Sequence, residues 1–243
     1  MTELDFANYV QQVSFRFLSP SAHNRVILKL NRTLRPLNIG LELMNTKLPE
    51  RRKEMQEKLH DLLRMPRMST FAIGAIINKG VSEMSADSSF VNVGVWHGFT
   101  LLSGLAGNPE KRCIGVDNFS EFGGPREGFL DEFTKRKSPN HYFYEMDYRD
   151  YFSHKHSGRI GFYLYDGEHS YENQLEGLRI AEPFFSERCC VLVDDTNWEE
   201  PRQATLDFIA SSRYKYQVLL DQNTGQNRHP TLWNGLFVFR RVC

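Results

Sequence analysis

Carboxylates and a histidine stand directly after two short apolar segments of the chain. Asp166 follows the first segment, and Asp194 and Asp195 follow the second. Apolar segments of this length are typical of buried parallel strands. Because adjacent parallel strands end at one edge of a sheet, where open α/β folds bind ligands, we expect these side chains to lie together. Three carboxylates suit a magnesium-type cation, and the neighbouring His169 suits a general base.

The segment 92–100 also has residues suited to binding a ligand. Gly94 and Gly98 lie where a predicted strand passes into a predicted helix, so the backbone can approach a ligand closely. The dinucleotide-binding fingerprint requires a glycine at the position of Trp96, and a pyrophosphate would meet this indole. The turn therefore disfavours NAD and suits a ligand without phosphates, such as an adenosyl amino acid. An ordinary tight turn would carry the same two glycines.

The next two predicted strands also end in polar side chains. Asp117 and Asn118 close one strand, and Asp147 follows the other. A carboxylate at Asp117 can accept hydrogen bonds from both hydroxyls of a ribose. Asp147 could accept a hydrogen bond from an adenine amino group. Each acid alone could instead cap a helix, but their succession favours a nucleoside site.

Alternating strands and helices must position these residues between 88 and 243. The predicted strands are Ser89–Val93, Arg112–Asp117, His141–Met146, Ile160–Tyr165, Cys189–Asp194, Tyr214–Leu220 and Gly235–Val242. The predicted helices are Thr100–Ala106, Gly128–Lys135, Tyr171–Ala181 and Glu199–Ser211. This alternation predicts an α/β fold with a seven-stranded, mostly parallel sheet and helices on both faces. A polar loop joins the last two strands, which predicts an antiparallel last strand.

The first 87 residues differ in character and are predicted to form a helical extension. Apolar residues at helical spacing predict an amphipathic helix over 50–65, and 71–84 predicts a second helix that leads into the first strand. The start of the chain, up to about residue 45, is expected to be irregular and to cover the active site as a lid.

Composition excludes several classes of function. The chain has 243 residues with 30 basic and 30 acidic side chains and no basic block, which argues against a nucleic-acid partner. No stretch is apolar enough for a membrane helix, and the charged N-terminus is not typical of a signal peptide. The four cysteines lack zinc-site spacing. We therefore expect free thiols and a cytoplasmic location.

From about Phe90 to its end, the chain resembles the class I S-adenosylmethionine-dependent methyltransferases. Within that group it is similar to the metal-dependent O-methyltransferases of the macrocin O-methyltransferase type. The segment 92–100 resembles their acidic-x-Gly-x-x-x-Gly-x-Ser/Thr motif, and 166–172 matches their Asp-Gly-x-His-x-Tyr-Glu signature. Their paired aspartates correspond to 194–195. The resemblance implies a Rossmann-like methyltransferase fold over 88–243.

The resemblance also implies roles for individual residues. The donor-binding residues would be Asn92, Gly94, Gly98, Thr100, Asp117, Asn118, Asp147 and Asp166. The Mg²⁺ ligands would be Asp166, Asp194 and Asp195. His169 would be the catalytic base, and the N-terminus of the following helix is expected to lower its pKa. Asn92 departs from the family, which has a carboxylate there to hold the ammonium group of the donor.

These observations predict Mg²⁺-dependent transfer of a methyl group from S-adenosylmethionine to a hydroxyl of a small molecule. The resemblance suggests a sugar or a glycosylated natural product as the acceptor, and the long N-terminal segment makes a homodimer plausible. One alternative is a non-catalytic protein that binds the donor, which Asn92 would favour. Another is a relative of non-heme iron hydroxylases, which would require two histidines and one carboxylate.

Overall fold

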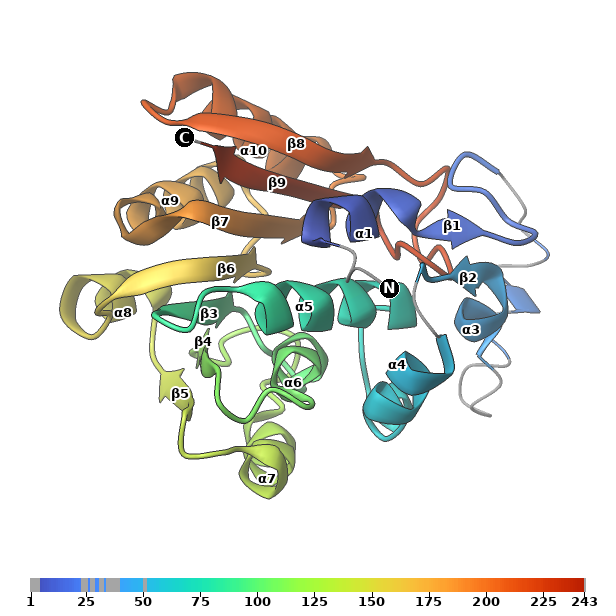
Figure 1. Cartoon of the computed structure of the whole chain (residues 1–243), viewed down its shortest axis with the longest axis horizontal. Coiled ribbons are helices and arrows are strands. Elements are labelled where there is room, and N and C mark those ends of the chain that lie inside the picture. Colours follow the sequence, from blue (N-terminus) through green and yellow to red (C-terminus); the bar gives the residue numbers. More distant parts are fainter. Residues whose placement is uncertain are drawn as a thin grey trace.

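A computed structural model gives the structure of residues 5–22, 26, 29–30, 33, 40–49 and 52–242 (Figure 1). The predicted lid includes residues 1–4 and most of 23–39, which lie outside the described residues. The predicted helix over 50–65 begins in an undescribed segment, and Cys243 is also undescribed. The other three cysteines are buried free thiols, as expected. Among the described helices, none is long and apolar enough to cross a membrane.

A seven-stranded sheet forms the centre of the fold. Its strands are, in spatial order, β5 (His141–Glu145), β4 (Arg112–Asp117), β3 (Ser88–Val93), β6 (Arg159–Tyr165), β7 (Phe185–Asp194), β9 (Leu236–Val242) and β8 (Lys215–Gln222). The first five strands are parallel, and β9 is antiparallel to both β7 and β8. The prediction of a mostly parallel sheet with an antiparallel last strand is confirmed. The chain order reverses between β3 and β6, and such a switch point is where α/β sheets bind ligands.

Helices cover both faces of the sheet, as predicted (Figure 1). One face packs against α1 (Phe6–Gln12), α5 (Phe71–Glu83), α6 (Phe99–Leu105) and α7 (Arg126–Arg136). The other face packs against α8 (Tyr148–His154), α9 (Tyr171–Ala181) and α10 (Glu199–Ser211). The position of strand β6 between two hydrophobic cores explains why its sequence is almost wholly apolar. Phe162 and Leu164 enter the first core, while Tyr163 and Tyr165 enter the second.

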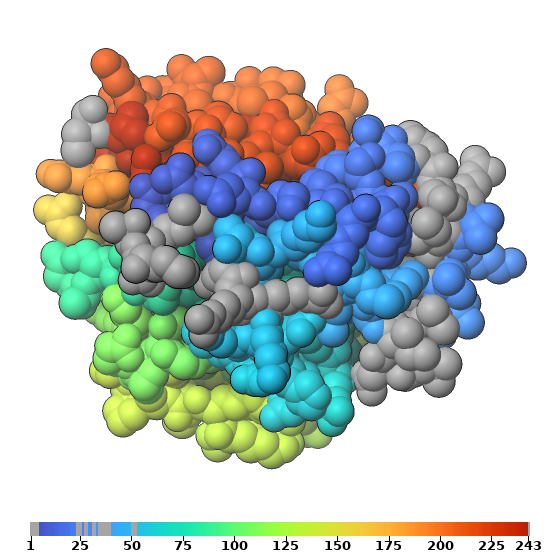
Figure 2. Space-filling view, turned by 45° about the vertical axis from the view of Figure 1, so that its right-hand side comes forward, coloured from blue at the N-terminus to red at the C-terminus, as the bar shows by residue number. Residues whose placement is uncertain are grey.

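The N-terminal part contributes short elements that pack beside the sheet. They are β1 (Ser14–Phe15), α3 (Leu41–Asn45), β2 (Thr46–Lys47), α4 (Arg52–Leu59) and the 3-10 helix η2 (Leu62–Arg64). The predicted helix over 50–65 is thus divided, with α4 ending at Leu59 and η2 following after a turn. In Figure 2 the blue N-terminal residues lie against the orange-red C-terminal part of the chain.

Candidate functional site

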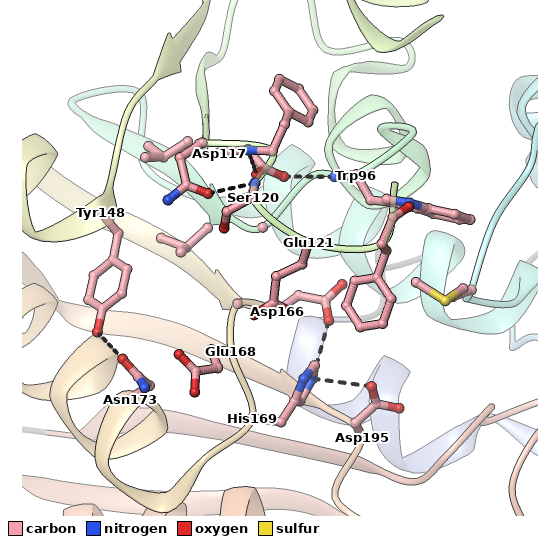
Figure 3. A pocket seen from close by; sticks show the side chains of 18 of the residues that line it. Trp96, Asp117, Ser120, Glu121, Tyr148, Asp166, Glu168, His169, Asn173 and Asp195 are labelled. Atoms are coloured by element: carbon pink, nitrogen blue, oxygen red, sulfur yellow. Dashed lines mark hydrogen bonds and ion pairs between the residues drawn. The ribbon is translucent and has the colours of Figure 1, made fainter. Parts of the chain in front are cut away.

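A cavity of about 370 Å³ opens at the carboxyl ends of the parallel strands (Figure 3). Of the residues predicted from sequence, Gly94, Asp117, Asn118, Asp147, Asp166, His169 and Asp195 line it. Four others do not line it, namely Asn92, Gly98, Thr100 and Asp194. The structure therefore brings most of the predicted donor-binding and metal-binding residues to one cavity, and the remaining four lie outside its lining.

Gly94 allows the ends of β3 and β6 to meet. Its φ is +77°, and a Cβ atom there would lie 1.9 Å from the carbonyl oxygen of Asp166. The amide of Asp166 donates to the carbonyl of Val93 at 2.9 Å, which holds the two strand ends together. Gly98 also has a positive φ, but a Cβ atom there would meet Phe129 at 2.7 Å. Gly94 therefore shapes the cavity floor, whereas Gly98 allows α6 to pack near α7.

Asn92 and Thr100 are buried beneath this turn. The Asn92 amide Nδ2 donates to the carbonyl oxygens of Val93 at 3.2 Å and Gly94 at 2.8 Å. The side chain is fully buried, and its Oδ1 has no hydrogen-bond partner among the described residues. Thr100 is buried on α6. In this structure Asn92 stabilises the turn and does not face the cavity, so the amide has a local use that a carboxylate could not serve.

Asp117 binds the same turn from the neighbouring strand. Its Oδ2 accepts from the backbone amides of Val95 and Trp96 at 2.7 and 2.9 Å, and its Oδ1 accepts from Phe119 at 2.7 Å. A carboxylate has about four acceptor positions. The three backbone bonds therefore leave room for one ribose hydroxyl in this conformation, where the sequence suggested two. Asn118 beside it accepts from the amide of Ser120 at 3.1 Å.

Asp147 caps a helix and also lines the cavity. Its carboxylate accepts from the amide of Arg149 at 2.8 Å and is the N-cap of α8. The Arg149 guanidinium lies 3.4 Å from the Asp147 carboxylate and 2.6 Å from that of Glu176. The capping alternative that the sequence left open is thus realised. The cap does not prevent this acid from facing a ligand, because it keeps its place at the cavity wall.

Asp166, His169 and Asp195 form a cluster at the other end of the cavity (Figure 3). His169 Nε2 lies 3.1 Å from Asp195 Oδ2 and 3.6 Å from Asp166 Oδ1. One ligand atom from each residue lies within 4.8 Å of the other two. His169 reaches the cluster because Ser170, next to it, is the N-cap of α9, which fixes the turn after Asp166. The cluster will be called the Asp–His–Asp cluster.

Asp194 does not belong to the Asp–His–Asp cluster, and its role as a third metal ligand stays a prediction. It is the last residue of β7, pairs with Leu236 of β9, and is buried. Its Oδ1 accepts from the amide of Asp195 at 2.9 Å. Asp195 leaves the strand with a φ of +58°, a conformation that directs only the second carboxylate toward His169. Burial raises the pKa of Asp194 well above its ordinary range, and the charges of Asp195 and Asp166 add to this effect.

The pKa of His169 is raised, contrary to the expectation that a helix N-terminus would lower it. Burial lowers the pKa, but the nearby carboxylates of Asp166 and Asp195 outweigh burial and raise it to about 10. Burial in turn raises the pKa of Asp166 to about 6, although the contact with His169 lowers it. Without a further positive charge at the cluster, the imidazole is therefore protonated at neutral pH and cannot accept a proton.

The β8–β9 loop supplies further residues of the cavity wall. Asn227, Arg228, Trp233 and Asn234 line the cavity beside the cluster. The Asn234 amide Nδ2 donates to Asp195 Oδ1 at 2.6 Å. No motif marks this asparagine, because its partner lies 39 residues away in the sequence. The ring of Trp198 also lies edge-on to His169, with centroids 5.1 Å apart.

The N-terminal part holds this loop in place. The amide of Gly225 donates to the carbonyl of Pro20 at 2.6 Å. Asn45 donates to the hydroxyl of Thr231 at 2.9 Å, and Thr70 donates to the Thr231 carbonyl. The described residues of the N-terminal part therefore support one wall of the cavity from outside.

The Asp–His–Asp cluster has donor atoms that fit a divalent cation. His169 Nε2 is buried and lies near two carboxylates, yet it makes no well-aligned hydrogen bond among the described residues. Carboxylate oxygens suit Mg²⁺, and a carboxylate–imidazole set also suits Mn²⁺, Zn²⁺ or Fe²⁺. The glycine turn and Asp117 in the same cavity provide the close backbone approach and the acceptor that an adenosyl ligand requires.

Comparison with known proteins agrees with this geometry. Residues 91–196 match the model of the family described as "Methyltransferase domain", a segment that contains both the turn and the cluster. Among solved structures, a protein from Corynebacterium glutamicum is 13% identical, with a TM-score of 0.57 over 79% of this chain and 89% of the other. The fold is that of the Rossmann-like methyltransferases. No curated protein matches the chain by sequence.

Two further structural neighbours of this fold are O-methyltransferases. One, from Bacillus cereus in complex with SAH, is 10% identical and has a TM-score of 0.55 over 88% of this chain and 97% of the other. The second is a TDP-rhamnose 3'-O-methyltransferase of calicheamicin biosynthesis. It is 17% identical and has a TM-score of 0.53 over 93% of this chain and 99% of the other.

Proposed function

We propose that this protein is a metal-dependent O-methyltransferase that uses S-adenosylmethionine to methylate a hydroxyl of a small molecule. The observation that carries the proposal is the position of the Asp–His–Asp cluster in the same cavity as Gly94 and Asp117. The cavity thus combines the features of an adenosyl site with a group that can bind a cation and move a proton. When bound, the donor would supply an activated methyl group, and a divalent cation would lower the pKa of the acceptor hydroxyl.

In this proposal, the residues of the chain have separate roles in binding the donor, holding the cation and moving the proton. Gly94 and Asp117 would position the donor, and Asp166 and Asp195 would hold the cation. His169 would take the proton of the acceptor hydroxyl. Because its pKa is raised by the two carboxylates, it can act as a base only when other positive charge compensates them. The same geometry that places His169 in the site therefore supports metal dependence.

The acceptor would approach past Trp198 and the β8–β9 loop. Trp198 is 41% exposed at the cavity, beside the imidazole. An aromatic ring beside a catalytic group can pack against the apolar face of a sugar. The structural neighbour that methylates a deoxysugar nucleotide supports a sugar hydroxyl as the acceptor.

The alternatives fit the cluster less well. A non-heme iron hydroxylase would require two histidines and one carboxylate, whereas the cluster offers one histidine and two carboxylates. The alternative of a non-catalytic donor-binding protein rested on Asn92, but this side chain has a structural role in the turn.

Calorimetry and a turnover assay test the proposal. Wild-type protein should bind S-adenosylmethionine and, separately, Mg²⁺ or Mn²⁺, and it should release S-adenosylhomocysteine with TDP-rhamnose or another sugar of an acceptor panel only when the metal is present. Asp166→Ala should lose metal binding and turnover. Asp150→Asn removes a carboxylate from the exposed surface of α8 and is the matched control. Failure of the wild type to bind the donor would overturn the methyltransferase proposal, and turnover unaffected by a chelator would overturn only the role of the metal.

A further inference from the structure

Asn234 contacts the Asp–His–Asp cluster and the β8–β9 loop at the same time. Its Nδ2 donates to Asp195 Oδ1 at 2.6 Å, and its Oδ1 accepts from the backbone amide of Arg228 at 2.8 Å. Its backbone carbonyl accepts from the amide of Asn197 at 2.7 Å. The side chain is only 8% exposed. An amide is required for this arrangement, because one end must donate and the other must accept.

At the cluster, Asn234 fixes the orientation of a carboxylate. Asp195 directs Oδ2 to His169 and Oδ1 to Asn234, so its two oxygens have different partners. The terminal torsion of an aspartate is otherwise broad. The residue also has a φ of +58°, which is uncommon for a side chain larger than glycine and requires support from its surroundings. Without Asn234, nothing else among the described residues donates a hydrogen bond to Asp195 Oδ1.

At the loop, Asn234 fixes the wall that faces the acceptor. Arg228 has a φ of +63°, and Asn234 holds the amide of this left-handed residue. Gly235 follows with a φ of +92°, where a Cβ atom would lie 2.8 Å from the amide nitrogen of Asn197. The loop therefore has one conformation in which Arg228 lines the cavity while Asn234 reaches Asp195. A change in the loop would move the carboxylate, and the reverse also holds.

We propose that Asn234 is a positioning residue. It orients Asp195 toward His169 and holds the β8–β9 loop at the cavity wall beside the Asp–His–Asp cluster. The role of Asn234 in methyl transfer rests on the proposed function, whereas its contact with Asp195 does not. Partners that orient catalytic or metal-binding side chains typically change activity by about 10–100-fold when they are removed.

Asn234→Asp separates positioning from support of the loop. The new carboxylate can still accept from the amide of Arg228, but it cannot donate to Asp195 and repels it. If Asn234 only supports the loop, this variant should behave as the wild type. If it positions Asp195, kcat should fall about 10–100-fold while the dissociation constant for S-adenosylmethionine stays within about twofold. Asn223→Asp makes the same substitution at an exposed position of the same loop, where Asn223 accepts from Arg202, and should leave kcat unchanged.

A spectroscopic measurement works even if no acceptor is methylated. In metal-free protein labelled at histidine nitrogens, the His169 signals are assigned by their loss in His169→Gln. These signals should move in Asn234→Asp and in Asn234→Ala but not in Asn223→Asp. A double variant, Asn234→Asp with Asp195→Asn, restores one donor and one acceptor and should regain melting temperature relative to Asn234→Asp alone. Unmoved His169 signals, or a double variant no more stable than the single one, would overturn the proposal, whereas failure of donor binding in wild type would overturn only the proposed function.

Discussion

Replacement of Asn92 by aspartate gives this chain the acid that the resembled family carries, and we expect it to harm the protein. The family comparison alone predicts tighter donor binding, because a carboxylate would attract the ammonium group of S-adenosylmethionine. The structure predicts the opposite. The Asn92 side chain is fully buried, and its Nδ2 donates to the carbonyls of Val93 and Gly94. An ionised aspartate would face two carbonyl oxygens with no proton to share.

The magnitude follows from the two lost bonds. A buried acceptor left without its donor costs about 1–3 kcal/mol. Burial raises the pKa of the new carboxyl group, so near neutral pH it is partly protonated and can donate one hydrogen bond. We therefore expect Asn92→Asp to lower the free energy of unfolding by about 2 kcal/mol at pH 5.5 and about 3–4 kcal/mol at pH 8. The sign follows from the raised pKa, because the folded state favours the protonated form and loses stability as pH rises.

Urea unfolding at both pH values measures this effect, and calorimetry with S-adenosylmethionine measures the donor. Asn92→Ala is the control, since it deletes the same bonds without adding a titrating group. It should be destabilised relative to wild type by the same amount at both pH values. Tighter donor binding by Asn92→Asp, without loss of stability, would refute the assignment of this side chain to the turn.

Two further predictions concern the turn and the cluster. Gly94→Ala places a Cβ atom 1.9 Å from the Asp166 carbonyl oxygen at a φ of +77°, so urea unfolding should show that the free energy of unfolding falls by about 3 kcal/mol or more. Gly123→Ala is the control, because Gly123 also has a positive φ but has no atom within 4 Å, and its free energy of unfolding should fall by only about 1–2 kcal/mol. Equal losses in the two variants would contradict the clash. In metal-free protein, the raised pKa of His169 stabilises the fold fully below pH 6.5, and this contribution, on the order of 3–5 kcal/mol, should disappear as pH rises toward 10. Melting curves with a chelator should show this decline in wild type but not in His169→Gln, and parallel curves would argue against the pairing.

The sequence was sufficient for most of the sheet because its central strands are buried on both faces. Strand β4 and helices α9 and α10 have the predicted bounds, since each has a continuous apolar segment or a clear helical period. Helix α8 was not predicted. It has only seven residues, and its buried face consists of Tyr148, Tyr151 and Phe152 among charged neighbours. Its stability comes from the core it enters rather than from a local pattern.

The site could be predicted where consecutive strands deliver residues to one edge, and not where the backbone departs from the strand. Asp194 and Asp195 are equivalent in the sequence. The structure separates them because Asp194 is still in β7, whereas Asp195 has already adopted a left-handed conformation. Asn234 had no local signal, since a single amide in a polar loop acquires its partners only after folding. The predicted direction of the His169 pKa was wrong because two carboxylates at 3.1 and 3.6 Å outweigh a helix terminus.

In the proposed mechanism, the same charge balance would connect proton transfer to cation binding. Asp166 and Asp195 hold a proton on His169 as long as that proton is their nearest positive charge. Under the proposed function, a cation held by the two carboxylates would replace this charge, so the imidazole could release its proton and accept one from a substrate hydroxyl. In that case the base would be available only in the metal-loaded site. Asn234 would contribute to this control, because its amide donates to Asp195 Oδ1 and so orients the carboxylate.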